Sequence, residues 1–171
     1  MKTRILALDP ASTTGVADGY IGDTPALSVW RLREDADDEP HDIARRAARL
    51  LWLRISLEKP DVLAIEMPVP PHSAKGHTNA ATTVITQGLY FLYTGIAGAA
   101  RIKIVPAHIR RWRKAILGQG NLKGDIAKAR MMAMCRRMSL DPPDHNAAEA
   151  AGIWMWAAGT NEEALLRRAP A

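Results

Sequence analysis

Apolar residues in the first part of the chain come in short runs, a pattern typical of β-strands. Residues 4–8 form one run that ends at Asp9, and residues 15–20 and 26–32 form two more, with turn residues between them at 22–25. We therefore expect three strands. The short connections between them favour an antiparallel meander.

The remainder of the chain combines helical periodicity with two short strands. Ile43, Ala47, Leu50 and Leu51 recur at helical spacing, so one apolar stripe of the first helix faces a sheet. The expected elements are a helix over residues 42–59, a strand over 62–65, a helix over 79–100, a strand over 102–105, basic helices over 107–117 and 123–138, and a helix over 144–158. This order predicts an α/β fold with a mixed five-stranded sheet flanked by helices. We expect one domain over residues 1–158 and a frayed tail over residues 159–171.

Composition narrows the class of protein. The 171 residues are 47% apolar, which suits one globular domain, and no apolar run is long enough for a membrane span. Asp9 interrupts the N-terminal apolar run, which argues against a secretion signal. Cys135 is the single cysteine, which excludes an internal disulfide and a cysteine-rich zinc site. We expect a cytoplasmic protein that does not enter a membrane.

The net charge of +5 is unevenly distributed. Residues 34–42 hold six acids and no Lys or Arg, whereas residues 101–137 hold eleven Lys or Arg and the single acid Asp125. Both segments could be solvated faces. The basic segment also has the clustering that binding to nucleic-acid phosphates requires, so it favours a nucleic-acid partner.

Three acids stand where a sheet edge can bring them together. Asp9 ends the first strand, Glu66 ends the fourth, and Glu149 lies on the last helix. An isolated acid at a strand end is usually a turn or cap residue. That account is weaker for Glu66, because an unpaired carboxylate in so apolar a segment is costly to bury. Three converging carboxylates suit Mg²⁺ or Mn²⁺ and the two-metal hydrolysis of phosphodiesters.

Four segments, in order, resemble the Holliday junction resolvases of the RuvC type. They are ILALDPASTTGVA at residues 5–17, DVLAIE at 61–66, the stretch from VP at 105–106 to GQGNLK at 118–123, and NAAEA at 146–150. The resemblance covers about residues 4–157, and each segment alone is common. It implies an RNase H-like fold, a homodimer, and paired nicking of four-way DNA junctions. The turn after Asp9 is one residue shorter than in bacterial members and closer to phage-type relatives, so either a bacterial or a phage origin is open.

The resemblance also implies roles for individual residues. Asp9, Glu66 and Glu149 correspond to carboxylates that hold two Mg²⁺ or Mn²⁺ ions per active site, with Glu149 in place of the more usual Asp. Lys123 is a candidate donor to the scissile phosphate. The alternative is a solvated lysine at a helix start, since Gly124 occupies the more usual lysine position.

The fourth metal ligand has three candidates. Asn146 stands at the family's position three residues before Glu149, and His145 is four residues before it and shares its helical face. Asp144 follows two prolines and suits a helix cap. Asn146 and His145 rank ahead of Asp144 as metal-ligand and catalytic candidates.

Other residues have both a DNA-binding and a structural interpretation. The basic helix over 107–117 offers side chains for DNA phosphates, with a solvated face as the alternative; they are Arg110, Arg111, Arg113 and Lys114. His72 and Lys75 follow Glu66 in a loop that holds junction strands apart in the related enzymes, and simple exposure is their alternative. We expect Trp112 and Cys135 to serve packing.

Three other functions fit parts of the pattern. An ATP-binding protein of the sugar-kinase and actin group also opens on a strand, Asp and a Gly/Thr turn, but needs two such halves. A noncatalytic junction- or RNA-binding module has no reason to keep Asp9, Glu66 and Glu149 together. A nuclease of the same fold that acts on flaps or RNA–DNA hybrids is not separable from a junction resolvase by sequence.

Overall fold

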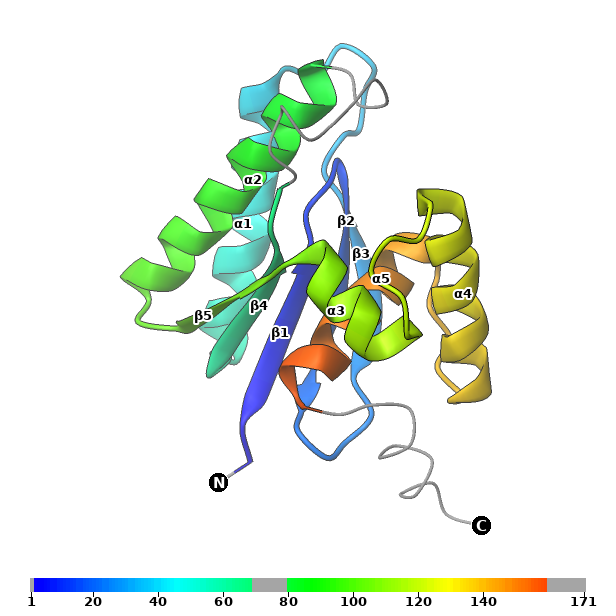
Figure 1. Cartoon of the computed structure of the whole chain (residues 1–171). Helices are drawn as coiled ribbons and strands as arrows, with labels where there is room; N and C mark the ends of the chain where they lie inside the picture. The colour runs from blue at the N-terminus through cyan, green and yellow to red at the C-terminus, as the bar shows by residue number, and fades with distance from the viewer. Residues whose placement is uncertain (1, 69–79, 160–171) are drawn as a thin grey trace.

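The computed structural model describes residues 2–68 and 80–159, which form a mixed sheet with helices on both faces (Figure 1). The elements, in chain order, are β1 (Arg4–Asp9), β2 (Thr13–Tyr20), β3 (Ala26–Arg31), α1 (Pro40–Leu57), β4 (Val62–Glu66), α2 (Ala80–Ala99), β5 (Lys103–Ala107), α3 (Ile109–Leu117), α4 (Gly124–Arg137) and α5 (His145–Ala157). The strand order is β3-β2-β1-β4-β5. β1, β2 and β3 pair antiparallel, whereas β4 pairs parallel with both β1 and β5. The predicted fold class is confirmed.

Strand alternation divides the core into two layers. Leu6 and Leu8 of β1 pack with α1 and α2 on one face of the sheet. Ile5 and Ala7, which point the opposite way, pack with α3, α4 and α5 on the other face (Figure 1). Asp9 continues the series of Ile5 and Ala7, so it points toward the α5 layer.

Small residues let α5 lie close to the sheet. The sheet face beneath it includes alanines from four strands, and α5 itself carries a run of alanines and Gly152. Gly15 of β2 touches the backbone of Asn146 so closely that an added Cβ would overlap its carbonyl group. Gly152 allows a similarly close approach between α5 and α3, because an added Cβ at this position would lie 2.7 Å from the Trp112 ring. Both α5 and α3 are therefore held at fixed positions over the sheet.

Several element ends differ from the sequence prediction by one or two residues, and two of these differences have identifiable reasons. β5 does not end at residue 105 as expected, since Pro106 lies within it, opposite Ile65, and the strand continues to Ala107. β5 is an edge strand, where a proline without an N–H is tolerated. α1 begins two residues earlier than expected, at Pro40, because proline suits the first turn of a helix.

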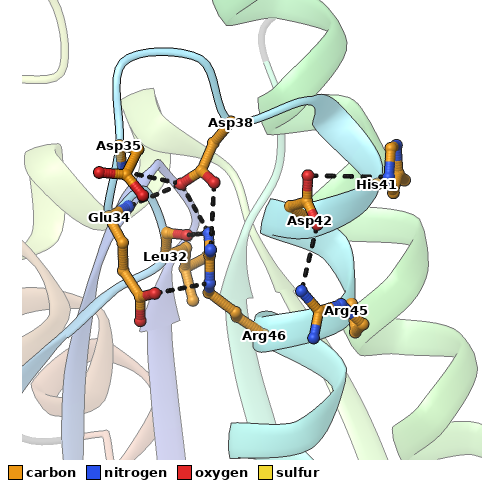
Figure 2. A network of polar contacts seen from close by, with 8 residues as sticks. All are labelled: Leu32, Glu34, Asp35, Asp38, His41, Asp42, Arg45 and Arg46. Atoms are coloured by element: carbon orange, nitrogen blue, oxygen red, sulfur yellow. Dashed lines mark hydrogen bonds and ion pairs between the residues drawn. The ribbon is translucent and has the colours of Figure 1, made fainter.

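The acidic segment between β3 and α1 is a structured loop (Figure 2). The Asp38 carboxylate accepts the N–H groups of Glu34 and Asp35 and pairs with Arg46 at 2.6 Å, and Arg46 also donates to the Leu32 carbonyl. The Arg46 side chain and these N–H donors lower the pKa of Asp38 well below its usual range. One acid of this segment therefore has a structural function.

The described helices include none with the length and apolar character that crossing a membrane requires. The predicted domain limit at residue 158 stays a prediction, because residues 160–171 lie outside the described part of the chain.

Candidate active site

The register of the sheet brings two of the three candidate acids together. β1 and β4 are parallel neighbours, and Leu8 stands opposite Ile65, so Asp9 and Glu66 follow at the same end of adjacent strands. Both side chains point to the α5 layer, since they alternate with Leu8 and Ile65, which pack on the opposite face. The mixed sheet thus produces the juxtaposition that the sequence predicts.

Glu149 completes the group from above the sheet. It lies in the second turn of α5 and is only 6% exposed. Burial raises the pKa of both Asp9 and Glu66, and the charge of Glu149 raises it further, as expected for carboxylates within electrostatic reach of one another.

Two consecutive residues of α3 hold the two glutamates. The Trp112 indole Nε1–H donates to Glu66 Oε2 at 2.7 Å, and the Arg113 guanidinium forms an ion pair with Glu149. Trp112 and Arg113 are both buried, and the guanidinium lies 5.4 Å from the centre of the indole ring. α3 therefore fixes the direction of both carboxylates, one with a neutral donor and one with a cation.

The electrostatics of the group favour protons or cations. Burial, with the charges of Glu66 and Glu149, raises the pKa of Asp9 well above its usual value, against the opposing effect of Arg113 and Lys128. Burial and Glu149 raise the pKa of Glu66 to about 7, although the Trp112 hydrogen bond and the Arg113 charge oppose this. Carboxylates that repel each other in this way are stabilised by a positive ion placed between them.

The donor set fits a hard divalent cation. Asp9, Glu66 and Glu149 offer only oxygen, the ligand type that Mg²⁺ and Mn²⁺ prefer. Within residues 2–68 and 80–159, no three His, Cys, Asp or Glu side chains are already arranged as a cation cage. Since Glu149 is engaged by Arg113, the side chains would have to reorient to enclose an ion.

The three candidates for a fourth ligand lie together at the start of α5. Asp144 caps the helix, as expected, because its Oδ1 accepts the Ala147 N–H at 2.9 Å. Asn146 donates its side-chain N–H to Asp144 Oδ2 at 3.1 Å, and its backbone lies against Gly15, the partner of Asp9. His145 is the first residue of α5 and is partly buried. Asn146 lies beside Gly15, which pairs with Asp9 in the sheet, whereas the Asp144 carboxylate caps the helix. This arrangement favours Asn146 over Asp144 as the fourth metal ligand.

The basic candidates separate into exposed and buried residues. Arg110, Arg111 and Lys114 are exposed on α3, where they can meet a DNA phosphate, and Lys123 is exposed as the residue that precedes α4. Arg113 departs from the expectation, since it is 7% exposed and paired with Glu149 rather than displayed on the surface. The remaining two candidates, Lys75 and His72, lie outside the described residues.

Two contributions were missed at the sequence level. Trp112 is a core residue, as expected, but its hydrogen bond to Glu66 gives it a place in the site. The charge of Lys128, in α4, lowers the pKa of Asp9, although the sequence analysis considered only Lys123 and Gly124 at the start of this helix. The spacing of Lys128 could have indicated this role. It follows Gly124, the more usual lysine position, by one helical turn, so the two residues lie on the same face of α4.

No protein-family model and no curated protein sequence matches the chain. Solved structures do. The structure of RuvC from Thermus thermophilus has a TM-score of 0.64 and 14% identity, over 92% of this chain and 98% of that one. RuvC from the same organism in complex with a Holliday junction substrate gives 0.66 and 13%, over 97% and 95%. The chain has a RuvC-like resolvase fold. The yeast mitochondrial Holliday junction resolvase is also similar, with a TM-score of 0.56 and 13% identity over 97% of this chain and 83% of that chain.

Proposed function

We propose that the chain is a metal-dependent endodeoxyribonuclease that resolves four-way DNA junctions by paired nicking. The observation that carries the proposal is the convergence of Asp9, Glu66 and Glu149, from two parallel strands and a helix, at one end of a RuvC-like sheet. The solved RuvC complex with a Holliday junction supports branched DNA as the substrate class.

In the proposed reaction, different residues bind the metal ions, orient a carboxylate and bind the DNA phosphates. Asp9, Glu66 and Glu149 would hold two Mg²⁺ or Mn²⁺ ions, which when bound activate the attacking water and neutralise charge on the leaving oxygen. Trp112 keeps Glu66 Oε2 in one direction through its N–H, which orients the carboxylate whose other oxygen would be offered to an ion. Arg110, Arg111 and Lys114 would bind phosphates of the substrate beside the acids, and Lys123 would reach a phosphate nearer the cut.

Cleavage of a substrate panel tests the proposal. Labelled four-way junction, flap and RNA–DNA hybrid are incubated with the protein and Mg²⁺, and the products are mapped at nucleotide resolution. We expect two nicks at symmetric positions on the junction and slower cleavage of the other substrates. Preferential cutting of the hybrid or the flap would contradict junction resolution, and no cleavage with either Mg²⁺ or Mn²⁺ would favour a binding module.

The exposed basic face of α3 gives a second prediction. Charge reversal of Arg110 and Arg111 should weaken binding to any DNA, because phosphate contacts carry no sequence information. The slope of log affinity against log salt should fall by roughly one unit for each phosphate that the protein no longer neutralises, measured by fluorescence anisotropy. Arg49→Glu, an exposed change on α1 across the sheet, is the matched control and should leave the slope unaltered. Equal slopes in all three proteins would place the DNA elsewhere.

A two-fold homodimer would match the two strands that a junction offers for cutting. We propose α2 as the interface, because it buries Leu89 and Tyr93 against the sheet but leaves Val84 and Phe91 58% and 69% exposed. We expect a dimer by light scattering at micromolar concentration and a monomer for Phe91→Glu. Leu57→Glu, an equally exposed site on α1, should remain dimeric. A monomeric wild-type protein that still cut both strands at matched positions would contradict this prediction.

A further inference from the structure

Arg113 is held among acids without having all of its donors satisfied. Arg113 and Glu149 are 7% and 6% exposed, and Nη2 of the arginine donates to Oε1 of the glutamate. Its Nε is buried and has no hydrogen-bond partner within the described residues. Leaving a buried donor unpaired is costly, and a guanidinium stays charged at any ordinary pH. The negative charge of the neighbouring carboxylates is therefore what keeps Arg113 in this position.

Its charge acts on the other two acids as well as on Glu149. Arg113 lowers the pKa of Asp9 and that of Glu66, in opposition to the repulsion among the three carboxylates. In the absence of a metal ion, the guanidinium thus supplies positive charge where the acids need it. A divalent ion coordinated by Glu149 would supply the same charge and would compete with Arg113 for the Glu149 oxygens.

The side chain borders a groove into which it could turn. The groove has a volume of about 670 Å³, and Arg113 shares its lining with Met67, His108, Arg110, Arg111 and Asn121. Two further arginines and an amide make this groove suited to an anion. A guanidinium turned into it would present its N–H donors, including the unpaired Nε, to a phosphodiester.

We propose that Arg113 is a positioning residue that occupies the cation position on Glu149 in the metal-free protein and moves to the groove when a divalent ion binds. The inference rests on the proposed function, because it takes Glu149 as a metal ligand. Metal binding would then turn an internal ion pair into an additional phosphate-binding group. Metal and DNA would each strengthen the binding of the other, since two linked equilibria must be reciprocal.

Calorimetric titration of Mn²⁺ into the full chain, without DNA, tests the exchange. Arg113→Gln removes the competitor, and we expect it to bind Mn²⁺ more tightly, on the order of tenfold, a change of about 1.4 kcal/mol. Arg113→Lys keeps the charge but loses the planar fork, so its affinity should lie between the two. Arg111→Gln, which removes the same charge from an exposed position on α3, should change the affinity less than about twofold.

A second measurement uses the unaltered side chain, in case Arg113→Gln does not fold with Glu149 unpaired. The Nε–H resonance of Arg113, assigned by its loss in Arg113→Lys, should shift in NMR spectra as Mg²⁺ is added. A resonance that stays in place while Mg²⁺ saturates, or an Arg113→Gln protein that binds Mn²⁺ no more tightly than wild type, would overturn the exchange while leaving the nuclease proposal intact. Absence of Mn²⁺ binding by the wild-type protein would instead contradict the proposed metal chemistry, and the exchange with it.

Discussion

Asp9→Asn is expected to abolish strand cleavage while leaving junction binding intact. The charges of both Glu66 and Glu149 act on Asp9, so the substitution removes an oxygen ligand that the proposed metal site shares with the two glutamates. The loss of single-turnover rate should exceed the roughly 100-fold that substitutions in the outer shell of a metal site typically cost. Binding should persist, because its main contacts are proposed to come from the exposed basic residues of α3.

The same substitution should raise the stability of the metal-free protein. Burial and the neighbouring glutamates raise the pKa of Asp9 in the folded state above its unfolded value. The folded protein therefore loses stability as the pH rises from the unfolded pKa of about 4 through the folded pKa, and Asn does not titrate. We expect Asp9→Asn to melt at a higher temperature than wild type at pH 7 in EDTA, with the difference shrinking as the pH falls from the folded pKa toward about 4 and absent below it.

Asp37→Asn, a change of the same kind on the exposed loop before α1, is the control and should alter neither cleavage nor melting appreciably. Full cleavage by Asp9→Asn would end the metal-site interpretation. A lower melting temperature for Asp9→Asn at pH 7 would show that the carboxyl is held by favourable contacts rather than repelled by its neighbours.

The sheet was predictable because its strands carry their own signals. Apolar runs that end at Asp9 and at Glu66 mark both the strands and the edge where the acids meet. The pairing of these two acids followed from the mixed topology, which places the ends of β1 and β4 side by side. Glu149 was a candidate because it lies on the last helix, and the resemblance supported it, since periodicity alone does not say which residue of α5 faces the sheet edge.

The role of α3 was not predictable from charge. Arg113 stands in a run of four basic residues, and a basic run usually marks a solvated face. It is buried because Trp112 packs against Gly152 of α5, which draws this side of α3 toward the acids. The burial of Arg113 thus depends on a contact between α3 and α5, which are far apart in sequence, and neither segment alone predicts that contact. Lys128 was also not predicted as part of the site, because its helical spacing from Gly124 does not show that its charge acts on Asp9, which lies on another element.

Gly15→Ala should impair both the fold and the site. Gly15 stands opposite Asp9 in the β1–β2 ladder, and its Cα faces the backbone of Asn146 at the start of α5. The added methyl group would overlap a backbone carbonyl, which cannot rotate away as a side chain could. Either α5 must lift or β2 must shift, and we expect a loss of stability at or above the upper end of the roughly 1–3 kcal/mol typical of overpacking.

Catalysis should fall further than stability alone explains. A lift of α5 moves Glu149 and Asn146 away from Asp9, and a displacement of about 1 Å can cost on the order of 100-fold in rate. Urea denaturation measures the stability, and single-turnover cleavage at a temperature where the variant is folded measures the rate. Gly95→Ala, in α2, is the matched control, because an added Cβ there meets no atom within 4 Å. It should stabilise the protein by about 0.5–1 kcal/mol, the usual gain for alanine over glycine in a helix, and leave the rate unchanged. If Gly15→Ala were as stable and as active as Gly95→Ala, the close contact between β2 and α5 could not be what sets the geometry of the site.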